Sequence, residues 1–172
     1  PFTVLSCDNL PENGALVRQI VLDFAHLIDP SLAQWIGENG RFPATMVDRI
    51  TPATTPANIA RVTAITDRYD AAPVLHEPFR QWAIEDHFVD GLRPDFAAVG
   101  IDMVDDVTPF EHMKLRMLNG SHSALAYLGY LAGYETISDT VADPAFTSYL
   151  RQLWSEIIPT AHAPKGYNLH DY

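Results

Sequence analysis

One stretch, Thr108–Gly133, constrains this chain more than any other, because its pattern is typical of a single long helix. Thr108 can serve as the N-cap, Pro109 suits the first helical position, and Glu111 would complete a capping box. Gly133 is a typical stop signal. The apolar side chains recur at helical spacing and predict a buried helix; they include Leu115, Leu118, Leu125 and Leu128.

Polar side chains gather on one face of this predicted helix. Glu111, Lys114, Asn119 and His122 fall within an arc of about 140°. A buried amine, amide and imidazole are costly unless they bind each other or a ligand. Lys114 could instead snorkel to water, and the amide and imidazole could be satisfied core groups. Their grouping favours a functional site over separate structural roles.

The composition excludes several classes of function. The chain has 172 residues, enough for one domain or one and a half, and no visible repeat. A net charge of −11 argues against nucleic acid and anionic membrane as partners. No apolar run is long enough to span a bilayer. The single Cys7 excludes an internal disulfide and fits a reducing cytoplasm. We expect a monomer or weak dimer.

The N-terminal segment Phe2–Cys7 is rich in strand formers and leads into the polar loop SCDNLPENG. Ligands of open α/β sheets gather at the carboxyl ends of strands. Asn9 is therefore a candidate site residue, although the local sequence by itself favours an ordinary Asx turn.

The remaining chain is predicted mainly as helices, with a few extended segments. Phe42–Pro52 is expected to be extended, and its Asp48 and Arg49 could form salt bridges or contact a ligand. Phe79–Phe88 fits a strand or a short helix. Ser31 is expected to cap a short helix through Trp35. The other predicted helices are Gly14–Ile28, Thr55–Asp67, Ile137–Ala142 and Ala145–Ile158, the last capped by Asp143.

Several common catalytic motifs are absent from the sequence. It has no GxGxxG turn, no Walker loop and no GxSxG elbow. Its histidines are scattered without HExxH spacing, so no metal site has sequence support.

Four blocks together carry a resemblance to a known family. The spacing K-x4-N-x2-H from Lys114 to His122, FPATMVDRITP at Phe42–Pro52, SCDNLPENG at Ser6–Gly14 and EPFRQWAIED at Glu77–Asp86 occur in the family's order. With them the chain resembles the polyol-specific long-chain dehydrogenases, the family of mannitol 2-dehydrogenase and D-fructuronate (mannonate) oxidoreductase.

The resemblance implies a fold that is mainly α. A Rossmann domain for NAD or NADP, with NAD favoured, precedes a helical domain like the C-terminal domain of 6-phosphogluconate dehydrogenase. Residues 1–52 would end the nucleotide-binding domain, and residues 53–172 would begin the helical domain. The glycine-rich turn would lie before Pro1 and further helices after Tyr172, so this fragment alone is expected to be inactive.

The resemblance also implies a role for each candidate residue. Lys114 is the expected acid/base, with Glu111 beside the proton path. Asn9 and Asn119 would hydrogen-bond the reacting oxygen, and His122 would orient the substrate. Asp48 would lie near substrate and cofactor, and Asn9 would also contact the cofactor. No metal is then needed.

The implied reaction interconverts D-mannonate and D-fructuronate, or D-mannitol and D-fructose. SCDNLPENG and EPFRQWAIED favour the fructuronate branch slightly. Two alternatives remain, namely another 3-hydroxyacid-type dehydrogenase and a non-enzymatic helical interaction domain that uses the apolar face of Thr108–Gly133.

Overall fold

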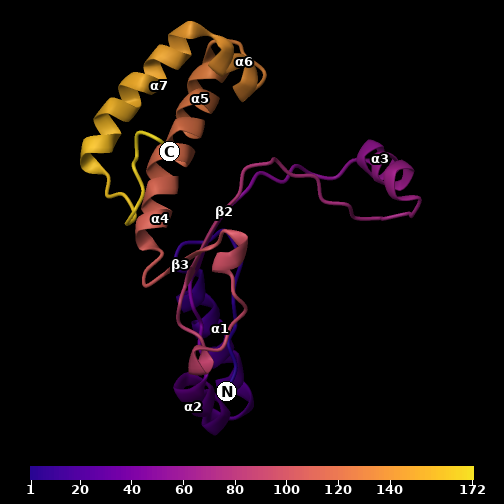
Figure 1. Ribbon diagram of the computed structural model, residues 1–172, viewed down its shortest axis with the longest axis vertical. Helices are drawn as coiled ribbons and strands as arrows, with labels where there is room; N and C mark the ends of the chain where they lie inside the picture. The colour runs from indigo at the N-terminus through magenta and orange to yellow at the C-terminus, as the bar shows by residue number, and fades with distance from the viewer. The chain divides into compact units, whose positions relative to one another are not determined.

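The computed structural model describes every residue from Pro1 to Tyr172. The chain forms two compact units, Pro1–Asp105 and Asp106–Tyr172, which we call the N-terminal unit and the helical unit. The N-terminal unit holds three α-helices and a small sheet, and the helical unit has no strands (Figure 1). The fold is therefore mainly α, as the sequence predicted. None of its helices is both long enough and apolar enough to cross a membrane.

Two packed helices begin the N-terminal unit. Helix α1 spans Asn13–Ile28 and α2 spans Pro30–Asn39. Their shared core consists of Ala25, Ile36 and Phe42. Asp29 caps α2, which corrects the expected cap at Ser31. The Asp29 carboxylate accepts both the backbone N–H and the hydroxyl of Ser31, each at 2.8 Å, so Ser31 is the donor of the cap.

The apolar stripe that predicts α1 lies on its exposed side. Leu27 is 84% exposed, and the other members of the stripe are also exposed. The helix packs on α2 through a different face, on which Ala25 is buried and Val17, Val21 and Leu22 are partly buried. The exposed stripe consists of Leu16, Ile20, Phe24, Leu27 and Ile28.

Three short strands form the sheet in the order β1-β2-β3. Strand β1 (Thr45–Asp48) runs antiparallel to β2 (Gln81–Glu85), which runs parallel to β3 (Asp102–Val104). Phe79–Phe88 thus contains a strand and not a helix. The segment expected as a strand at Phe2–Cys7 makes one parallel bridge, Thr3 to Arg41.

The sheet explains where the two units divide. Strands β2 and β3 follow residue 52 in the chain, yet they pair with β1 and each other in the N-terminal unit. The division after Asp105 therefore lies later than the domain end expected at residue 52. Sequence periodicity cannot show this, because cross-strand pairing joins residues that are distant in the chain.

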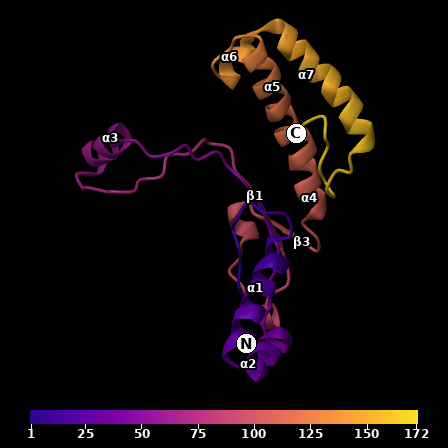
Figure 2. The same ribbon diagram turned by 180° about the vertical axis from the view of Figure 1, so that it is seen from behind.

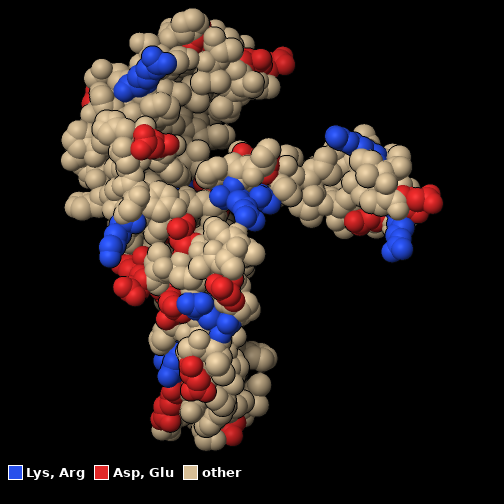
Figure 3. Space-filling view, viewed as in Figure 1, with Lys and Arg blue, Asp and Glu red and all other residues tan.

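Between β1 and β2 the chain runs out to α3 (Pro56–Thr66) and back (Figures 1 and 2). Thr55 caps α3 in a complete capping box with Asn58, which confirms the predicted helix start. No residue of α3 is buried, and charges of both signs surround it (Figure 3). Two 3₁₀ turns, Val89–Gly91 and Ala97–Val99, lie between β2 and β3.

The helical unit begins with a continuous helical rod and folds back through a helical hairpin (Figure 1). The rod comprises α4 (Thr108–Met113), a π-helical segment η3 (Lys114–Asn119) and α5 (Gly120–Leu131). Helices α6 (Ile137–Ala142) and α7 (Pro144–Ile157) and a 3₁₀ turn, Ile158–Thr160, follow. A Cβ at Gly129 would collide with the Thr140 side chain, so glycine permits the close contact of α5 and α6.

The start of the rod differs from the expected capping box. Thr108 lies inside the helix, and its backbone N–H donates to the Asp106 carboxylate at 2.8 Å. Hydrogen bonds from the hydroxyl and backbone of Thr108 lower the pKa of Asp106. The carboxylate takes the capping role because it accepts from both groups of Thr108. The predicted helix stop is confirmed, since Gly133, two residues after the last residue of α5, has φ +90°.

Candidate functional site

Lys114 is the one candidate of the rod that is buried, with 8% of its surface exposed. The buried side of the rod follows a regular stripe, and Lys114 lies within it. An amine withdrawn from water needs partners or a ligand. The apolar members of this stripe are Phe110, Met113, Met117 and Leu125.

The other candidates of the rod lie closer to solvent than the sequence predicted. Asn119 and His122 are exposed, and Glu111 is half-buried. Of the predicted apolar face only Leu125 is buried, while Leu115 is 58% exposed. The buried stripe runs instead through Met113 and Met117, and Leu115 and Leu118 lie outside it.

The π segment brings Lys114 and Asn119 into a closer relation than an α-helix allows. Residues five apart in an α-helix differ by about 140° around the axis. A π-helix bonds residue i to residue i+5, so residues five apart become neighbours, as residues four apart are in an α-helix. Lys114 and Asn119 are the first and last residues of this segment. The two residues are therefore neighbours along the rod, with the Lys114 side chain buried and the Asn119 side chain exposed.

A buried hydrogen-bond clasp holds the loop that carries Asn9. The Asn13 Nδ2 donates to the Asp8 carbonyl at 2.9 Å, and to the Thr45 carbonyl and hydroxyl at 2.9 and 3.1 Å. Its Oδ1 accepts the Thr45 N–H at 2.9 Å, and the Thr45 hydroxyl donates to the Ser6 carbonyl at 2.6 Å. The clasp ties both sides of the Asn9 loop to β1. Asn9 itself is exposed.

Asp48 ends the strand that this clasp holds. It is 8% exposed and lies directly opposite Gln81 in the antiparallel register. The Gln81 Oε1 is buried and accepts no hydrogen bond from the chain. Arg49, which follows Asp48 in the chain, donates from Nε to the Phe79 carbonyl at 3.0 Å. The clasp thus ties the loop that carries Asn9 to the strand that ends at Asp48.

The candidate residues offer an amine, amides, an imidazole and carboxylates. Nowhere in the chain do three His, Cys, Asp or Glu side chains gather as a metal-holding group. An amine beside an amide on one helix can exchange a proton with an oxygen and hydrogen-bond it.

Two family models match the chain, one to each unit. The model described as the mannitol dehydrogenase Rossmann domain matches residues 1–97, and the one described as the mannitol dehydrogenase C-terminal domain matches residues 106–172. The chain belongs to the mannitol dehydrogenase family. The family boundary falls where the two compact units divide.

Curated members of the mannitol dehydrogenase family align with almost the whole chain. D-mannonate oxidoreductase of Escherichia coli (strain K12) is 54% identical over 172 residues, which are 99% of this chain and 35% of that protein. Mannitol 2-dehydrogenase of Emericella nidulans is 44% identical over 100% of this chain and 35% of its own length. The chain spans about a third of the length of these relatives.

Two solved structures of dehydrogenases have the same fold. A D-sorbitol dehydrogenase in substrate-free form aligns with a TM-score of 0.93 and 42% identity. A mannitol 2-dehydrogenase of Pseudomonas fluorescens, in a ternary complex with NAD and D-mannitol, aligns with a TM-score of 0.79 and 46% identity. Each alignment covers 99% of this chain and 35% of the other chain.

Within this mannitol dehydrogenase chain, several contacts had no signal in the sequence analysis. Asn13 lies inside the SCDNLPENG block. Its separation from Thr45 in the sequence does not predict that the two residues are in contact. Gln81 lies inside EPFRQWAIED, and only strand register places it opposite Asp48. The sequence also gives no sign of the π segment, because its residues K-L-R-M-L-N occur commonly in α-helices.

Proposed function

We propose that the full-length protein is an NAD-dependent oxidoreductase that interconverts a sugar alcohol or aldonate with its ketose or keto-uronate. The observation that carries the proposal is the buried Lys114, placed one π turn from Asn119 in the chain's mannitol dehydrogenase C-terminal domain. The identity of 54% to a D-mannonate oxidoreductase supports the same class of substrate.

Lys114 is the proposed general acid/base. When a secondary alcohol is oxidised, its hydroxyl proton must leave as the C–H bond breaks, and the reverse reaction returns that proton. Lys114 accepts or donates this proton at Nζ, and Glu111, three residues earlier on the same helical rod, lies beside the proton path. The cationic amine also attracts the negative charge that develops on the substrate oxygen.

Asn119 and Asn9 are the proposed donors to that oxygen, and His122 orients the substrate. Preorganised amides stabilise developing negative charge with little reorganisation, which water cannot do. A lysine and two amides can therefore polarise the substrate oxygen, a role that a metal ion could otherwise fill. We propose that the reaction needs no metal.

NAD is the proposed cofactor, with NADP the alternative, and it supplies the acceptor or donor of the hydride when bound. The N-terminal unit offers an amide at Asn9 and a carboxylate at Asp48, next to the buried Gln81 oxygen. These groups fit the hydroxyls and amide of a nicotinamide riboside or a sugar. They do not fit a pyrophosphate, which needs the backbone donors of a glycine-rich turn.

A substrate screen of the purified full-length protein tests the proposal. The absorbance of the reduced nicotinamide cofactor would follow each reaction. Reduction would be tested on fructuronate, tagaturonate and fructose with NADH or NADPH, and oxidation on mannitol, mannonate and arabinitol with NAD or NADP. We expect reduction of fructuronate with NADH to have the highest kcat/KM. Absence of turnover with every pair would contradict the proposal and favour a helical interaction domain.

The same screen separates another class of dehydrogenase from the proposed one. A 3-hydroxyacid-type enzyme would oxidise short hydroxyacids such as 3-hydroxybutyrate and leave polyols untouched. We further propose that the protein works in the cytoplasm, as a monomer or weak dimer, and that the fragment Pro1–Tyr172 alone is inactive. Sedimentation of the full-length protein tests its oligomeric state.

A further inference from the structure

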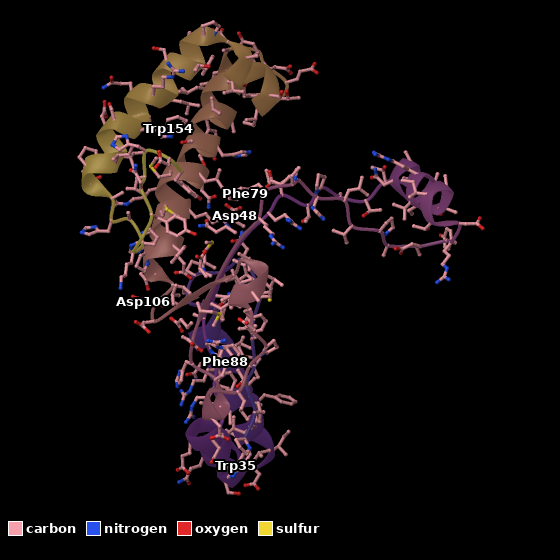
Figure 4. The ribbon with its side chains drawn as sticks, in the orientation of Figure 1. Trp35, Asp48, Phe79, Phe88, Asp106 and Trp154 are labelled. Carbon is pink, nitrogen blue, oxygen red and sulfur yellow. The ribbon has the colours of Figure 1, made fainter.

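A chain of hydrogen bonds reaches the π segment from α7. The Trp154 Nε1–H donates to the Ser121 hydroxyl at 2.7 Å, and this hydroxyl donates to the Met117 carbonyl at 2.5 Å. Trp154 lies in the last turn of α7 (Figure 4). Met117 belongs to the π segment, between Lys114 and Asn119.

The position of Ser121 makes this chain of bonds hard to replace. Ser121 is 7% exposed, so its hydroxyl cannot exchange its partners for water. A serine that bonds the carbonyl four residues earlier distorts the regular ladder of a helix. Here the distorted stretch is the π segment, and the indole of a second helix bonds the same hydroxyl. Hydrogen bonds that are linked through one hydroxyl polarise and strengthen one another.

A second tie joins the same segment to the end of the helical hairpin. The Arg116 Nη1 donates to the Thr160 carbonyl at 2.9 Å, directly after α7. The π segment is therefore held through Met117 on one side and Arg116 on another. π-helical turns are rare and are often found at functional sites, so support from two sides indicates that this one is maintained.

We propose that Ser121 and Trp154 are positioning residues, which hold the π turn and so keep Lys114 and Asn119 as neighbours along the rod. The inference rests on the proposed function. Without the π turn the two side chains return to the α-helical separation of about 140°. Displacement of a catalytic group by about 1 Å can cost about 10²-fold in rate.

The test uses the full-length enzyme with Ser121→Ala and Trp154→Phe. Ser121→Ala removes both hydrogen bonds of the hydroxyl, Trp154→Phe removes only the bond from the indole, and each variant keeps most of the packing. We expect each to lower kcat about 10- to 100-fold, with the calorimetric Kd for NAD within about twofold of wild type. Amide hydrogen exchange should become faster in peptides that cover residues 114–120. Ser121→Thr keeps the hydroxyl and should retain most of the activity.

Matched controls separate positioning from general destabilisation. Ser123→Ala makes the same change at an exposed serine two residues later, and Trp35→Phe at an exposed tryptophan of the N-terminal unit. Both should keep wild-type kcat and exchange. The double variant Ser121→Ala/Trp154→Phe should lose less than the product of the single losses, because both residues act through one carbonyl.

Each outcome bears on the inference separately from the proposed function. If amide hydrogen exchange at residues 114–120 is unchanged in both variants, Ser121 and Trp154 do not hold the π turn, whatever the activity. Faster exchange with unchanged kcat overturns the positioning role and leaves the proposed function standing. A wild-type protein without turnover in the substrate screen contradicts the proposed function and the positioning role with it, whereas exchange still decides whether Trp154 holds the π turn.

Discussion

Asn13 and Thr45 lie 32 residues apart in the chain and bind each other through three hydrogen bonds. Both are almost fully buried, at 2% and 1% exposure. The clasp fixes the loop of Asn9 against the strand of Asp48. Gly14 allows this approach, because a Cβ there would lie 2.5 Å from the Phe42 carbonyl oxygen.

Asn13→Ala should destabilise the full-length protein by at least about 2 kcal/mol. The substitution leaves the buried N–H and carbonyl of Thr45 without a side-chain partner, and each orphaned group costs about 1 to 3 kcal/mol. Urea unfolding followed by circular dichroism measures the loss. Asn39→Ala is the control, since Asn39 makes one bond, to the carbonyl of Trp35. Equal effects of the two substitutions would contradict a structural role for the clasp.

Lys114→Ala should lower kcat of the full-length enzyme by about 10² to 10⁴, while NAD still binds. Lys114→Arg keeps a cation that does not release its proton at working pH, so its kcat should be nearly as low as that of Lys114→Ala. Steady-state kinetics and calorimetric NAD binding measure the two effects. Lys165 is the other lysine of the chain and is exposed. Lys165→Ala should behave as wild type, and activity of Lys114→Ala within a few-fold of wild type would remove Lys114 from the mechanism.

Much of the local structure was predictable because its causes are local. The helix start at Pro56, the cap at Asp143 and the stop at Gly133 follow from side chains within a few residues. The four sequence blocks identified the family, which the family models confirm. Their residue roles stay predictions.

The features that the sequence did not show depend on packing between distant residues. A π turn needs one more residue per turn than an α-helix, and tertiary contacts such as Trp154 to Ser121 stabilise it. Lys114 is buried and Leu115 exposed within that same segment, a difference that only packing against other elements decides. Likewise, the exposed side of α1 carries the most regular apolar pattern, because packing on α2 uses another face.

The Tyr134–Asp143 pair should make stability depend on pH in the acid range. The Tyr134 hydroxyl donates to Asp143 at 2.6 Å, and this bond, with the N–H of Ala145, lowers the pKa of Asp143. A carboxyl whose folded pKa is lowered stabilises the fold above its unfolded pKa, near 4. That contribution is lost as the pH falls through the folded value.

Tyr134→Phe should therefore lower the unfolding midpoint above about pH 5, and the difference from wild type should shrink below about pH 4. Thermal unfolding from pH 3 to pH 7 measures it. Tyr149→Phe, at an exposed tyrosine of α7, is the control and should show no such trend. A difference that stays constant down to pH 3 would contradict the prediction.

Exhaustive chelation should leave the rate of the full-length enzyme unchanged. Lys114 and the asparagine amides can polarise the substrate oxygen without a cation. The measurement is kcat after dialysis against EDTA, with the metal content of the sample determined at the same time. A rate that collapses with EDTA and returns with zinc would defeat the proposed mechanism.

Asn9 and Asn119 should act on one oxygen as a pair. Asn9 belongs to the N-terminal unit and Asn119 ends the π segment of the helical unit. Removal of one oxyanion donor typically costs about 10² to 10³ in kcat. Each Asn→Ala variant of the full-length enzyme should lower kcat by that factor and change KM much less, because charge on the oxygen grows in the transition state.

The double variant decides whether the two amides share a target. Donors to one oxygen are coupled, so Asn9→Ala/Asn119→Ala should lose less than the product of the single losses. Asn168→Ala, at an exposed asparagine of the helical unit, should keep wild-type kcat and KM. Fully multiplicative losses would mean that the amides act on different groups. A neutral Asn9→Ala would return Asn9 to the role of a turn residue, whose backbone N–H donates to Asp8 at 3.0 Å.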